Sequence, residues 1–351
     1  MMKPIAVLGA GNSGLAMAAH LAMEGHSVHL WNRGSDTIAF LLQSPLIKVD
    51  GVINGEAHLK LVSSDIKEVL EGVSTVLVTT PANAHGDLAQ LLAPYVTKDM
   101  LIVLNPGRTF GALEFLTKLK EHGCVNSPLV IETQTIIYTC RKTGDDQVSI
   151  LAFKHDVFFS AVNHQLNPQI IELFPACLRP FFIPAPSMIE TSIGNVGMIL
   201  HCAPVLLNSG WIESPFTKFK YYYEGITPSV ARLLEKLDRE RLEVASLLGH
   251  PVESTAEWMR RSYEVDGNNL YECIQNNLAY HMIDAPGTLQ HRYILEDVSC
   301  GLVPLEAVGR NLGLPMRMCG LIINLANAML EMDFRKSGRI LDIDIIRGII
   351  K

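Results

Sequence analysis

A glycine-rich turn near the N-terminus constrains the fold of this chain more than any other feature. The apolar run 5–8 leads directly into the hexapeptide GAGNSG, and apolar residues then recur at helical spacing over 15–25. In this strand–turn–helix context the G-x-G-x-x-G pattern is specific for dinucleotide binding. Gly9 allows a tight turn, Gly11 admits a pyrophosphate close to the backbone, and Gly14 lets helix and strand pack closely. The helix N-terminus then offers its free N–H groups to the anion.

Strand-like and helix-like segments alternate through the first half of the chain. Further strands are predicted at 27–31, 76–79, 101–104 and 128–132, with helices at 84–92 and 111–122. This alternation predicts a doubly wound parallel sheet of the Rossmann type. Because such sheets bind ligands beyond the carboxyl ends of their strands, the turn residues there become candidate cofactor contacts. Those candidates are Gly9, Gly11, Asn12, Ser13, Gly14, Asn32, Arg33, Pro81 and Asn105.

The pattern changes after about residue 184. Long helical periodicities follow at 227–248, 254–263 and 315–332, and strand signals almost vanish. The sequence therefore predicts an α/β Rossmann domain over 1–184 that binds the dinucleotide, followed by an all-helical C-terminal domain over 185–351 that supplies substrate-binding and catalytic groups.

Composition and charge exclude several function classes. The net charge is −7 with no long basic run, so nucleic acid is not an expected partner. The seven cysteines form no CxxC pair, which indicates free thiols in a reducing compartment. We expect neither a disulfide framework nor a metal site. Only a short apolar run precedes the glycines, so no signal peptide or membrane anchor is predicted and the expected location is cytoplasmic.

The end of the second predicted strand bears on the choice between NADP and NAD. An acidic residue there would accept hydrogen bonds from the ribose 2′-hydroxyl and favour NAD. The chain instead has Asn32 and Arg33, and Arg33 could pair with a 2′-phosphate. The alternative is a solvated Arg33, with Asp36 turned back to the ribose. The sequence therefore favours NADP, with NAD as the alternative.

Two clusters in the second half of the chain carry groups suited to proton transfer. Asn195 and His201 lie in an apolar segment, 194–204, that we expect to be helical. A single histidine on such a helix is more often a core residue, but imidazole is the side chain best suited to proton transfer near neutral pH. Arg292 and Asp297 lie in the segment 291–304. This second segment is either a solvated helix face or a site in which Asp297 fixes the imidazole tautomer and Arg292 grips a carboxylate or the pyrophosphate.

These segments also resemble a known family. Residues 292–293, 296–298 and 301–304 (RY, EDV and GLVP) are similar to the signature of the opine dehydrogenases, the octopine/nopaline dehydrogenase group, and especially of the bacterial N-(1-carboxyethyl)norvaline dehydrogenase type. So are 195–201, 206–208 and 222–229. The resemblance extends over essentially the whole chain, including 105–107 and 139–141.

The resemblance implies an NAD(P)-dependent oxidoreductase with its active site in the cleft between a Rossmann and a helical domain. The implied reaction joins a 2-oxo acid and the amine of an amino acid as an imine, which NAD(P)H reduces to a secondary-amine dicarboxylate. His201, Asp297 and Asn195 would be the catalytic residues, and Arg292 would bind substrate. The chain departs from the family at Gly197, where relatives often have a second Asn, and at Cys202, where they often have Pro. The Asn-Arg tip also departs from the acidic tip expected of NAD-preferring members.

Two other functions remain open on the sequence alone. Ketopantoate reductase and glycerol-3-phosphate dehydrogenase share this domain order but normally use a catalytic lysine, and neither C-terminal cluster here contains one. A non-catalytic NADP(H)-binding redox sensor is the alternative of another class. The expected partners are therefore a small 2-oxo acid and an amino acid, and an apolar C-terminal helix is compatible with a homodimer.

Overall fold

A computed structural model describes residues 3–350 of the chain. The chain divides into two compact units. The first contains the chain up to Gly107 together with Gly111–Pro186, and the second contains Arg108–Phe110 together with the chain from Ser187 onward. A short segment that lies within the first unit in sequence is therefore built into the second.

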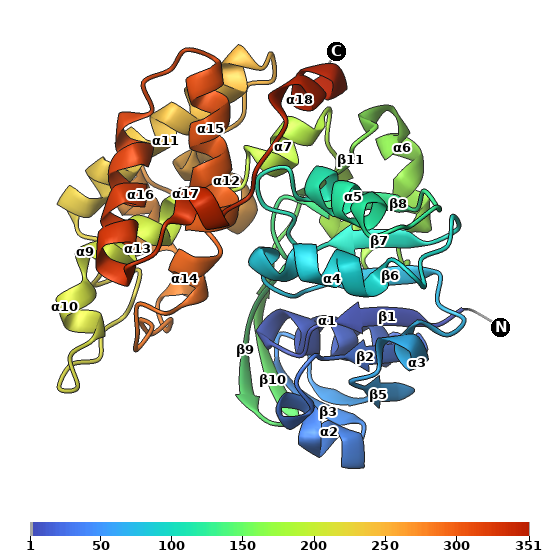
Figure 1. Cartoon of the computed structure of the whole chain (residues 1–351). Coiled ribbons are helices and arrows are strands. Elements are labelled where there is room, and N and C mark those ends of the chain that lie inside the picture. Colours follow the sequence, from blue (N-terminus) through green and yellow to red (C-terminus); the bar gives the residue numbers. More distant parts are fainter. Residues whose placement is uncertain (1–2, 351) are drawn as a thin grey trace. The chain divides into compact units, whose positions relative to one another are not determined.

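The first unit is organised around an eight-stranded sheet with the order β12-β11-β8-β7-β6-β1-β2-β5 (Figure 1). Its strands are β1 (Ile5–Leu8), β2 (Val28–Trp31), β5 (Leu61–Ser63), β6 (Thr75–Val78), β7 (Leu101–Leu104), β8 (Leu129–Thr133), β11 (Val157–Ala161) and β12 (Phe182–Pro184). From β8 to β5 every pairing is parallel, whereas β11 joins β8 in antiparallel orientation. The structure confirms the predicted parallel sheet and the five strands predicted from apolar runs.

The register of this sheet brings the predicted turn residues to one edge. Leu8 is paired with both Trp31 and Val78, and Val78 is paired with Leu104. These are the last residues of their strands, so the turns that begin at residues 9, 32, 79 and 105 emerge side by side. A ligand at this edge would meet all of these turns.

Short helices connect the strands of the first unit. They are α1 (Asn12–Met23), α2 (Ala39–Gln43), α3 (Ile66–Leu70), α4 (His85–Leu92), α5 (Gly111–Glu121) and α6 (Asn167–Ile170), with 3₁₀ turns at Ser35–Ile38, Ala82–Ala84, His164–Leu166, Ile171–Leu173 and Arg179–Phe181. Helix α1 begins three residues before the predicted one because the glycine turn feeds directly into it.

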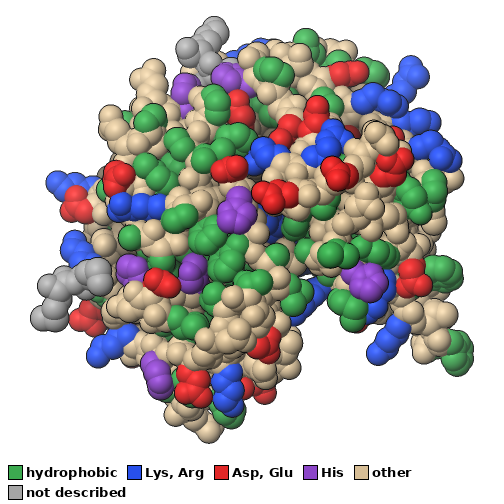
Figure 2. All heavy atoms as spheres, turned by 180° about the vertical axis from the view of Figure 1, so that it is seen from behind, with side chains coloured by type: hydrophobic (Ala, Val, Ile, Leu, Met, Phe, Trp, Pro, Cys, Tyr) green, Lys and Arg blue, Asp and Glu red, His purple; other side chains and the backbone are tan. Residues whose placement is uncertain are grey.

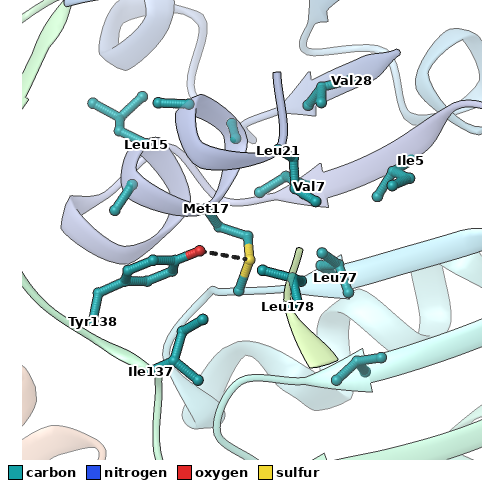
Figure 3. Close-up of a cluster of buried hydrophobic side chains, with 14 of the residues drawn as sticks. Ile5, Val7, Leu15, Met17, Leu21, Val28, Leu77, Ile137, Tyr138 and Leu178 are labelled. Atoms are coloured by element: carbon teal, nitrogen blue, oxygen red, sulfur yellow. Dashed lines mark hydrogen bonds between the residues drawn. The ribbon is translucent and has the colours of Figure 1, made fainter. Parts of the chain in front are cut away.

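A second sheet, which the sequence patterns did not predict, covers the other side of α1. It has the order β4-β3-β10-β9, with β3 (Leu46–Gly51), β4 (Gly55–His58), β9 (Tyr138–Gly144) and β10 (Gln147–Phe153). Figure 3 shows Met17 of α1 among Val7 and Leu77 of the large sheet and Tyr138 at the start of β9, in one buried cluster. Helix α1 is therefore packed between two sheets, which explains why its residues from Gly14 to Leu21 are buried.

The second unit is helical. Its helices are α7 (Met188–Ser192), α8 (Gly197–Leu200), α9 (Cys202–Leu207), α10 (Ser209–Ile212), α11 (Pro228–Leu247), α12 (Thr255–Tyr263), α13 (Leu270–Asn276), α14 (Arg292–Leu295), a π-helix at Val298–Leu302, α15 (Val303–Asn311), α16 (Arg317–Leu330), α17 (Phe334–Ser337) and α18 (Ile343–Ile350), with a 3₁₀ turn at Leu278–Tyr280. The long helix α11 packs against α13, α15 and α16 (Figure 1). Within the described part of this unit, β pairing is limited to one bridge between Lys220 and Asp284.

The expectation of a helix running through 194–204 needs correction. The structure has α8 and α9 with His201 between them, and residues 194–196 precede the first of these helices. Pro204 has no N–H to donate to the carbonyl of Leu200, so the regular hydrogen-bond ladder is interrupted there. The Tyr221 hydroxyl donates instead to the carbonyls of Leu200 and His201, at 3.2 and 2.7 Å.

The most apolar helical stretch is also mostly buried. Among the described residues, Met188–Leu207 is the one stretch long and apolar enough to cross a membrane, and 89% of that window lies inside the fold. Such burial is what the core helix of a soluble protein shows. On the face drawn in Figure 2, Lys and Arg side chains are interspersed with Asp and Glu.

Candidate active site

The glycine turn of the first unit has the geometry that a pyrophosphate requires. Gly9 has a φ of +113°, which favours glycine, and a Cβ on Gly14 would lie 1.7 Å from the Gly9 carbonyl oxygen. A Cβ on Gly11 would meet nothing within 4 Å, so this side of the turn is open. Helix α1 starts at Asn12 without a side-chain cap, which leaves its first N–H groups for a ligand. The residues present therefore fit a dinucleotide.

The other predicted cofactor residues fall into two groups. Asn32 accepts a hydrogen bond from the Ala10 N–H at 3.0 Å, and its amide donates to the Gly34 carbonyl, so it braces the glycine turn. Arg33 is exposed, and its guanidinium lies 3.9 Å from the equally exposed Asp87 carboxylate. The side chains of Asn12 and Asn105 are used within the protein, where Asn12 accepts from the Lys142 N–H and Asn105 donates to the Val103 carbonyl.

Pro81 and Ser13 complete the predicted set. Pro81 is exposed and immediately precedes the 3₁₀ turn Ala82–Ala84, and Ser13 is half-buried in the first turn of α1. Pro81 follows the end of β6 and Ser13 follows the end of β1, at the edge of the sheet where the turns emerge side by side.

In the second unit, the structure brings His201 and Asp297 together although they are 96 positions apart in sequence. The imidazole Nδ1 lies 2.8 Å from the Asp297 carboxylate Oδ2. Asp297 is fully buried, and 12% of the His201 side chain is exposed. Because the carboxylate occupies Nδ1, Nε2 is the nitrogen left for proton exchange with a substrate.

The imidazole is held on its face as well as at its edge. The ring of Tyr293 stacks on that of His201 with the centroids 3.9 Å apart and the planes 10° from parallel. Tyr293 lies in α14, and Asp297 immediately precedes the π-helix Val298–Leu302, a distortion that is frequent at functional sites. The break between α8 and α9 leaves His201 outside both helices.

The surroundings of His201 lower its pKa from the ordinary value. Burial is the main cause, because desolvation penalises the imidazolium. The Asp297 carboxylate acts in the opposite direction and raises the pKa, whereas the positive charges of Arg108 and Arg292 lower it further. The free site therefore favours a neutral imidazole near neutral pH, which can accept a proton.

Arg108, which the sequence patterns did not single out, lies at the centre of the site. Its guanidinium is buried and donates to Glu296 Oε1 at 3.0 Å and to Asn195 Oδ1 at 2.9 Å, and it lies 3.1 Å from Asp297 Oδ1. Asn195 also accepts the Gly197 N–H at 2.9 Å. The side-chain oxygen of Asn195 thus holds Arg108 and the start of α8. Buried carboxylates are stable only beside a cation, and Glu296 and Asp297 are adjacent in an otherwise apolar segment. This pair of acidic residues was the sequence signal that a buried arginine or lysine should lie nearby, although it did not indicate which one.

Arg292 lies at the accessible edge of the same cluster. About half of its side chain is exposed, at 48%, and its NH1 is 3.5 Å from Glu296 Oε2. Its guanidinium carbon is 5.6 Å from the centre of the Tyr293 ring. The alternative of a solvated helix face is wrong for Glu296 and Asp297, which are buried, and holds only in part for Arg292.

Comparison with known proteins places this geometry in a family. Residues 184–330 match the model for the α-helical domain of NAD/NADP octopine/nopaline dehydrogenases, and residues 4–106 match the N-terminal model of NAD-dependent glycerol-3-phosphate dehydrogenases. An opine dehydrogenase from Arthrobacter sp. (strain 1C) is 38% identical over 97% of this chain and 94% of its own length. The chain belongs to the opine dehydrogenase family.

Solved structures agree with this opine dehydrogenase fold. Octopine dehydrogenase in complex with NADH and agmatine superposes with a TM-score of 0.76 and 20% identity, covering 99% of this chain and 95% of the other. Yersinopine dehydrogenase bound to NADP⁺ superposes with a TM-score of 0.79 and 14% identity, covering 99% and 98%. Both share the Rossmann and helical parts.

Family membership decides between the functions left open by the sequence. This opine dehydrogenase is an NAD(P)-dependent oxidoreductase, and its reaction is the reductive condensation of a 2-oxo acid with an amino acid. The interpretations as a ketopantoate reductase-like enzyme or as a non-catalytic sensor are thereby replaced.

Proposed function

We propose that His201 is the proton-transfer residue of this reductive condensation and that Asp297 holds it in the required tautomer. The observation that carries the proposal is the 2.8 Å contact between Nδ1 and the buried carboxylate. With the Nδ1 proton directed at Asp297, a neutral imidazole has its lone pair on Nε2. In the oxidative direction Nε2 takes the proton of the secondary amine, and in the reductive direction it returns that proton. NAD(P)H, when bound, supplies the hydride that reduces the imine carbon.

The remaining roles follow from charge and position. Arg292 is cationic, half-exposed and close to the His201–Tyr293 stack, so it is suited to bind a substrate carboxylate. Asn195 holds Arg108 through its side-chain oxygen, and in this proposal it keeps its predicted place among the catalytic residues as a support of the proton-transfer pair. In this proposal dinucleotide binding belongs to the predicted domain over 1–184, and substrate binding and proton transfer belong to the domain over 185–351, to which Arg108–Phe110 are added because they lie in the helical unit.

The test of this function is a substrate-dependence assay. The purified enzyme is mixed with NADPH or NADH, pyruvate and one of a panel of amino acids, and cofactor oxidation is followed. We expect oxidation only when oxo acid and amino acid are both present, and the isolated product should be a secondary-amine dicarboxylate. Oxidation with the oxo acid alone would contradict a requirement for both substrates. Cofactor binding without turnover on any mixture would show that the substrate pair lies outside the panel.

We further propose NADP(H) as the preferred cofactor, because the tip of β2 offers Arg33 and no carboxylate. Replacing Arg33 by alanine should raise the KM for NADPH about 10- to 100-fold, because a lost charge-assisted hydrogen bond costs roughly 1.5–3 kcal/mol. The KM for NADH should change little. The matched control is Asp87→Ala, which removes the nearby carboxylate and should not weaken NADPH binding. An equal rise for both cofactors would contradict the assignment.

Location and assembly complete the proposal. A cytoplasmic enzyme is supported by the cysteines, which are all free thiols. A homodimer is supported by apolar side chains on α16, where Leu321 is 49% and Met329 36% exposed.

A further inference from the structure

Arg108 belongs to the short segment Arg108–Phe110, whose backbone is held by hydrogen bonds to the helical unit. Arg108 itself has a φ of +63°, a conformation that non-glycine residues rarely adopt. The Thr109 N–H donates to the Cys300 carbonyl at 3.1 Å, and Arg339 donates to the Thr109 carbonyl at 2.7 Å. The Phe110 N–H donates to the Ser192 hydroxyl at 3.0 Å. The strained backbone is thus held by the helical unit, which is the pattern expected where a side chain must occupy one position.

The guanidinium completes the contacts of the Asp297 carboxylate. Oδ2 of Asp297 binds His201, and Oδ1 lies 3.1 Å from the NH1 atom of Arg108. With only the first contact, the carboxylate could turn about its Cβ–Cγ bond and carry the imidazole with it. The second contact is an ion pair without hydrogen-bond geometry, and its attraction opposes this rotation in the buried site. A third contact, the hydrogen bond from Arg108 to Glu296, holds the guanidinium in place.

Gly197 leaves the space that the guanidinium occupies. A Cβ at this position would lie 2.1 Å from the NH1 atom of Arg108, and 3.1 Å from both Asn195 Oδ1 and Asp297 Oδ1. The NH1 position and a side chain at 197 are therefore mutually exclusive.

We propose that Arg108 is a positioning residue for proton transfer, which fixes the Asp297 carboxylate and through it the direction of His201 Nε2. The proposal rests on the proposed role of His201. Arg108 stays charged at working pH because, although burial lowers its pKa, Asp297 and Glu296 raise it above the ordinary value.

Arg108 also contributes to the charge balance around the imidazole. Asp297, Arg108 and Arg292 act electrostatically on the His201 imidazole, and Tyr293 stacks on it. The neighbouring titratable groups are Glu296, which pairs with both arginines, Tyr221, which donates to the His201 carbonyl, and Cys202, the next residue in the chain. Burial is the largest cause of the lowered pKa of His201. Asp297 raises this pKa, and the positive charge of Arg108 lowers it. Removing the guanidinium charge should therefore raise the pKa of His201.

Replacing Arg108 by glutamine tests the proposal. We expect kcat to fall about 10²-fold, the loss that a misplacement of roughly 1 Å can cause, with little change in the KM for NADPH. The acidic limb of the oxidative pH profile and the basic limb of the reductive profile should both move to higher pH, because both report His201. Arg108→Lys keeps the charge, so its limbs should return toward their original positions while kcat remains reduced.

Two further variants separate positioning from simple stabilisation. Arg241 is a buried arginine of the same unit, paired with Asp238 and two carbonyls, and Arg241→Gln should lower thermal stability without moving the pH limbs. Gly197→Ala should displace the guanidinium and change kcat and the pH limbs in the same direction as Arg108→Gln. In the double variant Gly197→Ala/Arg108→Gln the alanine should change kcat and the pH limbs little further, because the guanidinium with which its Cβ would clash is absent.

The outcomes are distinguishable. Unmoved pH limbs in Arg108→Gln, with only thermal stability lowered, would overturn the positioning role. If Arg108→Gln does not fold, the other two variants test the positioning role. A Gly197→Ala variant with unchanged pH limbs would overturn it. So would an Arg108→Lys variant whose limbs shift as far as those of Gly197→Ala. Full turnover of His201→Ala would instead overturn the proposed function.

Discussion

Replacing His201 by alanine should lower kcat about 10²- to 10⁴-fold, the usual contribution of a general acid–base group. The loss follows because the variant lacks the imidazole whose Nε2 takes or returns the amine proton. Arg292 and the glycine turn, which would bind substrate and cofactor, are unchanged. The KM values for cofactor and substrates should therefore change little. Steady-state kinetics in both directions measure the effect.

A histidine of the same unit provides the control. His250 lies 3.6 Å from Glu190 and is partly exposed, so His250→Ala should keep nearly full turnover. If His201→Ala weakened only cofactor affinity and left kcat intact, the imidazole would be a binding group and the proposed role would be wrong.

Replacing Asp297 by asparagine should reduce kcat on a similar scale, by about 10²- to 10⁴-fold, as expected when an imidazole is held in the wrong tautomer. The asparagine amide can donate to Nδ1, which places the imidazole proton on Nε2 and blocks it as a base. The lost negative charge also removes a group that raises the pKa of His201. The pH limbs should therefore move to lower pH, opposite in sign to the shift expected for Arg108→Gln.

Opposite shifts in two variants of the same charge cluster are a stringent test, because general destabilisation would not produce them. Asp284→Asn is the control, since Asp284 pairs with Lys220 at the surface and its side chain is 66% exposed. Its pH profile should be unchanged. A pH profile of Asp297→Asn that moves upward, or not at all, would contradict the proposed charge balance.

The sequence predicted five strands of the central sheet because each is a short and mostly buried apolar run, whereas β5, β11 and β12 were not predicted. β1 and β7 are buried at all four positions, and runs of this kind are recognisable without tertiary information. The second sheet was missed because β9 and β10 mix exposed and half-buried residues and take part of their stability from packing on α1. Pattern alone does not distinguish such strands from loops.

The proton-transfer pair and its support differ in the same way. The expectation that His201 and Asp297 could act together came from residue type and family resemblance, and the structure supplies their contact. Arg108 could not be assigned, because nothing in its local sequence shows that the guanidinium lies among residues 87 to 189 positions away. The break at His201 was missed because a proline in the first turn of a helix is otherwise unremarkable.

The incorporation of Arg108–Phe110 into the helical unit limits how this enzyme can be recombined with its relatives. A chimera joined after residue 186 would inherit its helical half from one parent and its arginine from the other. If the second parent lacked an arginine there, Glu296 and Asp297 would be buried without their cation, a situation that typically costs roughly 3–5 kcal/mol. Productive exchange of substrate specificity therefore requires that this tripeptide be transplanted together with the helices.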